Sequence, residues 1–142
     1  MPMKIQPNKP ITIFLKEDEW FPNSKYPLLL YKNICKHEGE KGAEWLEALF
    51  AANNWTNAWR WGVYSYHHYH SNTHEVLGVF QGSAEIQFGG EHGEKVKVQQ
   101  GDGVVIPAGV GHKCLVHERG FTVVGAYPEG KSPDMNKGEK GE

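Results

Sequence analysis

The stretch His68-Tyr69-His70-Ser71-Asn72-Thr73-His74-Glu75 decides the fold of this chain, together with a second stretch that runs from Gly101 to His112. If the first stretch lies in a strand, the histidines on either side of Tyr69 face the same way, because side chains alternate along a strand with a period of two. Two imidazoles on one face, then a carboxylate, then a further histidine behind a turn, are ligands that first-row divalent metals accept. The sequence therefore indicates a metal site assembled from two separate parts of the chain.

The rest of the second half of the chain reads as short strands separated by turns. The expected strands are residues 58–69, 75–80, 84–88, 95–99, 104–106, 113–117 and 121–126. Glycine, proline and aspartate stand between them, as in tight turns. Short strands at regular spacing are typical of sandwiches and barrels, and no helix separates them as it would in a parallel sheet. A mainly β fold is expected.

The first part of the chain is expected to add further elements to this β fold. The pattern predicts strands at residues 11–15 and 27–34 and a helix at residues 42–52, where apolar side chains recur at helical spacing. The expected division is residues 1–55 for the N-terminal strands plus helix packed on the barrel, residues 56–130 for the barrel, and residues 131–142 for a polar tail. That tail has too little apolar surface to offset its ordering entropy, so we expect it to be mobile.

Composition narrows the possible partners. The chain has 142 residues, of which 23% are charged, and its net charge of −2 gives no reason to bind nucleic acid or an anionic membrane. No apolar run approaches the roughly 20 residues that span a bilayer. The two cysteines, Cys35 and Cys114, do not make a disulfide framework, and a cytoplasmic protein with both thiols reduced is expected. A single bridge between them stays open as the alternative.

Two ordered motifs in this half of the chain resemble those of the cupin superfamily. The first is carried by Gly62, His68, His70, Glu75 and Gly82, and the second by Gly101, Pro107, Gly109 and His112. The spacings agree at every one of these positions, whereas Val116 stands where the second motif ends in asparagine. The chain also resembles a group of small bacterial single-domain cupins of unassigned function. The resemblance implies a single-domain cupin, a double-stranded β-helix or jelly-roll barrel.

The resemblance further implies that His68, His70, Glu75 and His112 bind one divalent transition metal, namely Mn, Fe or Ni. Affinity alone does not choose among such metals, and zinc is less expected because four protein ligands already make a closed tetrahedral site. The alternative is a barrel without metal, in which these side chains are buried and hydrogen-bonded to one another.

Strand alternation places three further side chains on the face of His68, provided that the strand is regular. Tyr64 and Tyr66 are the candidate catalytic residues, because a phenol could donate a proton or orient a polar ligand. Arg60 could hold a carboxylate. The alternatives are two tyrosines that fill the core and an arginine at the barrel mouth, with Gly62 as a bulge that breaks the alternation.

The remaining candidates near the site each have two interpretations. His74 could replace Glu75, support a ligand or shuttle a proton, but a solvent-facing loop histidine is favoured. On the same alternation, the apolar wall of the site consists of Leu77, Val79, Cys114 and Val116. Cys114 is expected to be a small buried hydrophobe, the alternatives being an extra ligand or a redox-sensitive thiol.

Trp55, Trp59 and Trp61 cluster just before the first motif, and the last two are expected on the face opposite His68. An apolar face of this size needs a cover. The N-terminal elements or a second subunit could provide it, and a homodimer is expected.

The expected function is a divalent-metal-binding cupin that binds or acts on a small polar molecule, with carboxylate-bearing ligands among the options. If it is an enzyme, a metal-dependent oxygenase comes first and a metal-dependent decarboxylase or isomerase second. The competing class is a protein that holds a metal or metabolite without turnover. The sequence leaves the metal, the substrate and the presence of turnover open.

Overall fold

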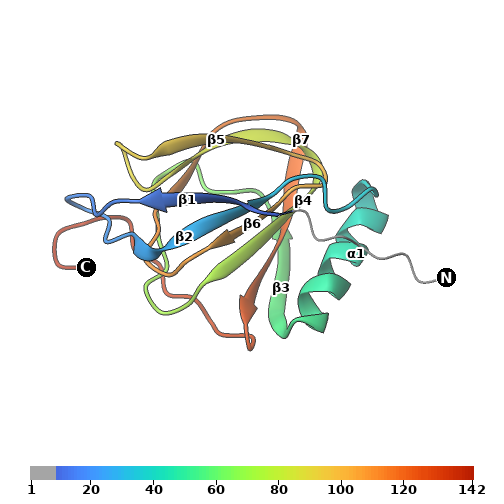
Figure 1. Cartoon of the computed structure of the whole chain (residues 1–142), viewed down its shortest axis with the longest axis horizontal. Coiled ribbons are helices and arrows are strands. Elements are labelled where there is room, and N and C mark those ends of the chain that lie inside the picture. The colour runs from blue at the N-terminus through green and yellow to red at the C-terminus, as the bar shows by residue number, and fades with distance from the viewer. Residues whose placement is uncertain (1–8) are drawn as a thin grey trace.

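The computed structural model describes residues 9–142. These residues form an antiparallel β-sheet and one helix (Figure 1). The strands are β1 (Ile11–Leu15), β2 (Ser24–Tyr31), β3 (Trp55–Trp61), β4 (Glu75–Phe88), β5 (Glu94–Gln99), β6 (Gly103–Ile106) and β7 (His112–Pro128), and the helix is α1 (Gly39–Ala52). The strand order is β1-β2-β6-β4-β7-β3, and β5 pairs with β4. This is the jelly-roll arrangement expected from the sequence. Residues 1–8 of the predicted N-terminal part lie outside the described residues.

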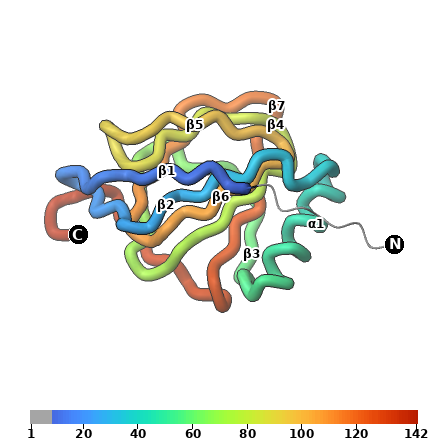
Figure 2. Tube along the Cα trace, viewed as in Figure 1, coloured from blue at the N-terminus to red at the C-terminus, as the bar shows by residue number. Residues whose placement is uncertain are grey.

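Two long, bent strands form the spine of the barrel. β4 and β7 pair along nearly their whole length, from Val76 opposite Ala126 to Phe88 opposite His112. The first half of β4 also pairs with β6, and its second half pairs with β5. The tube in Figure 2 shows both strands curving through the molecule. β4 therefore has β7 along one edge and β6 followed by β5 along the other.

The sequence predicted two short strands where each of these long strands runs. Gly82 in β4 was read as a turn, but its backbone has φ of 73° and forms an irregularity at which the pairing register shifts. Arg119 and Gly120 do the same in β7, with φ of 58° and 71°. Such bulges bend a strand without ending it, so the prediction of separate strands was wrong there.

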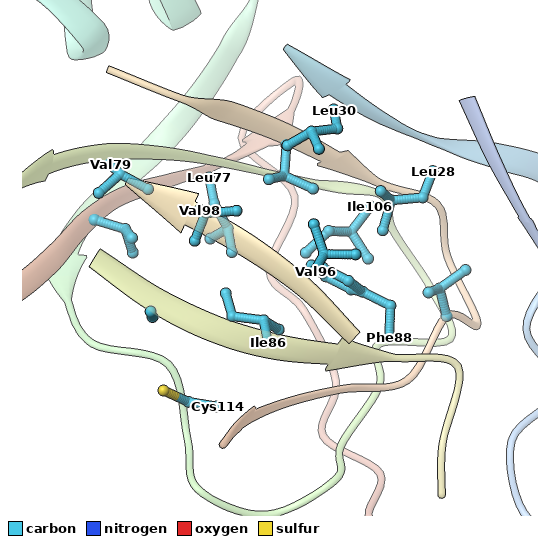
Figure 3. Close-up of a cluster of buried hydrophobic side chains, with 14 of the residues drawn as sticks. Leu28, Leu30, Leu77, Val79, Ile86, Phe88, Val96, Val98, Ile106 and Cys114 are labelled. Carbon is cyan, nitrogen blue, oxygen red and sulfur yellow. The ribbon is translucent and has the colours of Figure 1, made fainter. Parts of the chain in front are cut away.

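The bulge in β4 also changes which side chains face the core. Leu77 and Val79 point inward before it, whereas Ile86 and Phe88 point inward after it, and all four are at most 2% exposed. Figure 3 shows these side chains meeting those of β2, β5 and β6 in one cluster. The inward-facing residues change from odd to even numbers because one residue is inserted into the alternation.

Helix α1 covers the β3 side of the barrel (Figure 1). Leu46 and Phe50 pack on β4 at Gly78, where an added Cβ would lie only 2.8–2.9 Å from their side-chain atoms. The absence of a side chain at Gly78 therefore lets the helix approach the sheet closely. The helix was predicted from residue 42 and begins three residues earlier, at Gly39.

Two strand boundaries and one contact of the C-terminal segment also bear on the expected division of the chain. β2 begins at Ser24, inside the predicted turn, and β3 ends at Trp61 rather than at residue 69. Within residues 131–142, expected to be a mobile tail, Asn136 forms an isolated bridge with Tyr69. Within residues 9–142 no helix is long and apolar enough to cross a membrane.

Candidate metal centre

Four side chains from three places in the fold meet inside the barrel. His68 and His70 lie in the connection between β3 and β4, Glu75 is the first residue of β4, and His112 is the first residue of β7. All four are buried, with exposed fractions of 2–7%. The backbones of His68 and His112 hydrogen-bond to each other in both directions, at 3.1 and 2.9 Å. This bridge joins the two sequence motifs directly.

The polar atoms of this cluster converge on a common centre. One ring nitrogen of each of His68, His70 and His112 lies within 4.8 Å of the other two. The Glu75 carboxylate faces them, with Oε1 at 3.3 Å from Nε2 of His112 and Oε2 at 3.4 Å from Nε2 of His70. Nε2 of His112 is buried and has no hydrogen-bond partner among residues 9–142. The cluster thus contains a potential metal-binding nitrogen that forms no hydrogen bond with the described residues.

The contacts of Nδ1 in each histidine ring indicate that Nε2 is the nitrogen available to a metal. Nδ1 of His68 lies 3.1 Å from the carbonyl of Tyr66, and Nδ1 of His112 lies 3.1 Å from that of Val110. Nδ1 of His70 lies 2.6 Å from the carbonyl of Asp134. A carbonyl only accepts, so each ring, when neutral, carries its proton on Nδ1 and keeps the lone pair on Nε2. Metal-binding histidines are held in this way.

Burial and charge set the protonation of the cluster. Burial, followed by the charge of His112, lowers the pKa of His68 to about 3. For Glu75, burial raises the pKa, but the ring nitrogens of His112 and His70, 3.3 and 3.4 Å from its carboxylate oxygens, outweigh burial and hold the pKa well below its ordinary value. For His70, burial lowers the pKa, but the adjoining Glu75 carboxylate outweighs burial and raises the pKa overall. A neutral imidazole beside an ionised carboxylate is a donor set that fits a divalent metal.

A cavity of about 370 Å³ opens onto these four side chains. Its other walls are Trp59, Trp61, Gly62, Val63, Tyr64, Leu77, Tyr127, Pro133, Asp134 and Met135. Apart from the histidines, the ionisable side chains in this lining are those of Glu75, Asp134, Tyr64 and Tyr127, and none of the described residues adds a lysine or arginine to it. The cavity is walled mainly by aromatic and apolar groups, as small-molecule sites are.

The two candidate catalytic tyrosines differ in their relation to the cavity. Tyr64 lines it and is 47% exposed, whereas Tyr66 is outside the lining and 39% exposed. Their rings stack with centroids 4.9 Å apart, and both contact the His68 ring edge to face. The pair therefore covers His68 from the solvent side.

Arg60 does not lie beside the metal cluster, which corrects the expectation from strand alternation. Its guanidinium binds both carboxylate oxygens of Glu47, at 2.7 and 3.0 Å, and Glu40 at 2.7 Å, so it ties β3 to α1. Trp59 and Trp61, expected on the opposite face, line the cavity instead. The cause is that β3 ends at Trp61, so the alternation counted back from His68 does not extend through residues 62–67.

His74 and Cys114 follow the simpler of their two interpretations. His74 is exposed, and its Nδ1 accepts a hydrogen bond of 2.8 Å from the backbone of Ala108, which steadies the turn before His112. Cys114 is 5% exposed within the core, and burial raises the pKa of its thiol (Figure 3). Neither Cys114 nor Cys35 is in a disulfide.

The predicted apolar wall is only partly correct. Leu77 lines the cavity, but Val79 and Cys114 face the core and Val116 is 54% exposed. The pairing of β7 with β4 slips by one residue between Cys114 and Val116, because they stand opposite the consecutive residues Ile86 and Glu85. This bulge turns Val116 outward.

Tyr127 is a site residue that the sequence reasoning missed. It lines the cavity, is 5% exposed, and its hydroxyl accepts a hydrogen bond of 2.8 Å from Nε1 of Trp59. Burial raises its pKa, and the charge and a hydrogen bond of Glu75 raise it further, which places the hydroxyl proton toward that carboxylate. The strand was predicted to end at Ala126, two residues before its end at Pro128. Continuing the alternation from the inward-facing Val123 would have found Tyr127.

Several known proteins are similar to this chain in sequence or fold. A family model described as Cupin matches residues 62–128. The uncharacterized protein YjlB of Bacillus subtilis (strain 168) is 46% identical over 132 residues, which are 92% of this chain and 77% of YjlB.

Two solved structures illustrate the more distant likenesses. Acireductone dioxygenase from Bacillus anthracis, with a cadmium ion in its active centre, is 14% identical with a TM-score of 0.49, over 75% of this chain and 82% of the dioxygenase. Procruciferin, an 11S globulin from Brassica napus, is 22% identical with a TM-score of 0.45, over 56% of this chain and 21% of the globulin. Neither likeness assigns an activity to this chain. On the family model and the similarity to YjlB, the chain belongs to the cupin family.

Proposed function

We propose that this protein binds one divalent transition metal through His68, His70, Glu75 and His112 and uses it to hold a small molecule in the adjoining cavity. One observation carries the proposal. Three buried imidazoles and the Glu75 carboxylate converge on one centre, and within residues 9–142 no group forms a hydrogen bond with Nε2 of His112. A bound cation would compensate the burial of these groups, which is otherwise costly.

The cavity lining favours a neutral ligand over a carboxylate. It offers no lysine or arginine, and Arg60 is engaged with Glu40 and Glu47. A carboxylate in this cavity would meet Glu75 and Asp134 without a cationic side chain, and an unpaired buried charge is costly. Aromatic walls from Trp59 and Trp61 instead suit a flat or apolar body.

Among enzyme classes, this lining supports a metal-dependent oxygenase ahead of a decarboxylase or isomerase that acts on an acid. A metal such as Mn, Fe or Ni would supply Lewis-acid or redox chemistry when bound. The chain itself would exclude water with its aromatic walls, hold the Glu75 carboxylate through Tyr127, and offer the Tyr64 hydroxyl as a proton donor. Tyr66, outside the lining, would position His68 rather than touch the ligand.

Matched ligands test the proposal. Protein loaded separately with Mn, Fe or Ni would be given benzamide and benzoate, which share a ring and differ in charge. The expected result is a rise in melting temperature and quenching of tryptophan fluorescence with benzamide only, and loss of both in Trp59→Ala. A response to benzoate alone would contradict the neutral-ligand part.

Turnover separates the enzyme from a protein that only holds a metal or metabolite. Oxygen uptake or carbon dioxide release with a panel of neutral and acidic compounds, abolished in His112→Ala, would support an enzyme. Ligand-dependent thermal shifts without turnover across the panel would favour the non-catalytic alternative.

A homodimer and a cytoplasmic location are part of the proposal. The chain itself covers much of Trp55 and Trp59, but it leaves Trp61 73% and Phe14 68% exposed. Sedimentation at micromolar concentration should give twice the chain mass of 16.0 kDa, and the mass of one chain would remove the dimer. The two unpaired thiols agree with a reducing compartment.

A further inference from the structure

The segment after β7 runs back along the loop that carries His70. Tyr69 and Asn136 exchange two backbone hydrogen bonds, of 2.9 and 3.1 Å. The Asn72 side chain binds the carbonyl of Ser132 at 2.9 Å and the backbone nitrogen of Asp134 at 3.0 Å. These contacts attach residues 132–136, here called the strap, to the loop.

The side chain of Asp134 also attaches the strap to the loop. Its carboxylate accepts a hydrogen bond of 2.7 Å from the backbone nitrogen of Ser71 and a further short one from the Ser71 hydroxyl. The side chain of Asp134 thereby fixes the position of its own backbone.

That backbone reaches a member of the metal cluster. The carbonyl of Asp134 lies 2.6 Å from Nδ1 of His70. His68 and His112 take the equivalent carbonyl from residues two positions earlier in the chain, whereas His70 takes its own from 64 positions later. The orientation and tautomer of His70 therefore depend on a distant segment, unlike those of the other two histidines.

The strap also forms part of the cavity wall. Pro133, Asp134 and Met135 line the cavity on the side of His70. The tail continues to Gly138, where an added Cβ would lie 2.6 Å from the ring of Phe21, and its red end lies beside the blue loop between β1 and β2 in Figure 2. The strap is thus held at both sides of the position where it meets His70.

We propose that the C-terminal strap is a working part of the metal centre, in which Asp134 is a positioning residue that holds the Nδ1–H tautomer of His70 and leaves Nε2 free to bind the metal. This inference rests on the proposed function. Loss of an outer partner of a metal-binding histidine usually weakens metal affinity by about 10- to 100-fold. The same loss is expected when the strap detaches.

The first test compares Asp134→Ala with Glu139→Ala, which removes the same charge from an exposed position in the same tail. Competition between protein and a chromophoric chelator for Co²⁺ would measure the metal affinity. We expect Asp134→Ala to bind Co²⁺ about 10- to 100-fold more weakly than the unaltered chain and to change its visible spectrum, and Glu139→Ala to match the unaltered chain in both. Equal affinity and spectra for all three would overturn the inference.

A second readout does not need the metal. In the chelator-treated protein, ¹⁵N NMR of the histidine rings should show His70 protonated at Nδ1, with the signal shifting toward a mixture of tautomers in Asp134→Ala while His112 is unchanged. An Nε2–H tautomer of His70 in the unaltered chain would overturn the inference. Asn72→Ala should give the same shift as Asp134→Ala if the strap as a whole is responsible.

Two outcomes distinguish a failure of the metal proposal from a failure of the strap inference. If the unaltered chain binds no Co²⁺ but His70 shows the strap-dependent tautomer, the metal proposal fails and the positioning by the strap stands. If the chain binds Co²⁺ and Asp134→Ala binds it equally well, the strap inference alone fails.

Discussion

Tyr127→Phe probes how Glu75 is held. The substitution keeps the ring, which is 5% exposed, and removes only the hydroxyl between Trp59 and Glu75. Nε1 of Trp59 loses an acceptor at 2.8 Å, and the buried carboxylate loses a donor. A buried group left without its partner costs about 1–3 kcal/mol, and the adjoining cavity allows water to recover part of that cost. We therefore expect a loss of about 2 kcal/mol in the free energy of unfolding.

The assay is urea unfolding of chelator-treated protein, followed by far-ultraviolet circular dichroism. A loss of about 2 kcal/mol should lower the urea midpoint by about 1 M with an unchanged slope. Tyr64→Phe is the matched control, because Tyr64 lines the same cavity but is 47% exposed. A midpoint for Tyr127→Phe equal to that of Tyr64→Phe would refute the reasoning that this hydroxyl bridges Trp59 and Glu75.

Two further predictions concern packing and pH. Gly125→Ala should lower the free energy of unfolding by about 1–3 kcal/mol, because the added Cβ would lie 2.2 Å from the Trp59 ring. Gly62→Ala is the control, because a Cβ at Gly62 meets no atom within 4 Å. Equal stability of the two variants would contradict the close packing of Trp59 on Gly125. Arg60→Gln should cost about 1 kcal/mol above pH 4.5, since the hydrogen bond to Arg60 lowers the pKa of Glu47 from its ordinary 4.5. The pair's contribution is lost as pH falls through the lowered value, so the difference between Arg60→Gln and the unaltered chain should shrink in acid; a difference independent of pH would argue against the pair.

The fold was predictable because the decisive features are local in sequence. The alternation of apolar residues and the two motifs around His68 and His112 led to a mainly β cupin barrel, and the structure and the family model agree. The prediction of side-chain direction from alternation was wrong wherever a bulge inserts a residue. Gly82 and the slip before Val116 depend on the pairing of β4 with β7, which no single strand encodes.

The grouping of the candidate ligands was likewise predictable, whereas their surroundings were not. The structure brings His68, His70, Glu75 and His112 together, and their role as metal ligands stays a proposal. The position of the Arg60 side chain is set by the carboxylates of Glu40 and Glu47 on α1. The position of the Trp59 ring depends on the absence of a side chain at Gly125. Such contacts join parts of the chain far apart in sequence, so a pattern read along one strand does not contain them.

Metal content tests the central claim most directly. Tag-free protein purified without chelator would be analysed for its elements beside His112→Ala and His67→Ala, the latter being a half-buried neighbour of the cluster that lies outside the cavity lining. The account predicts close to one transition-metal ion per chain in the unaltered protein and in His67→Ala, and little in His112→Ala. Absence of metal from all three, persisting after Mn, Fe and Ni are each added back, would contradict it.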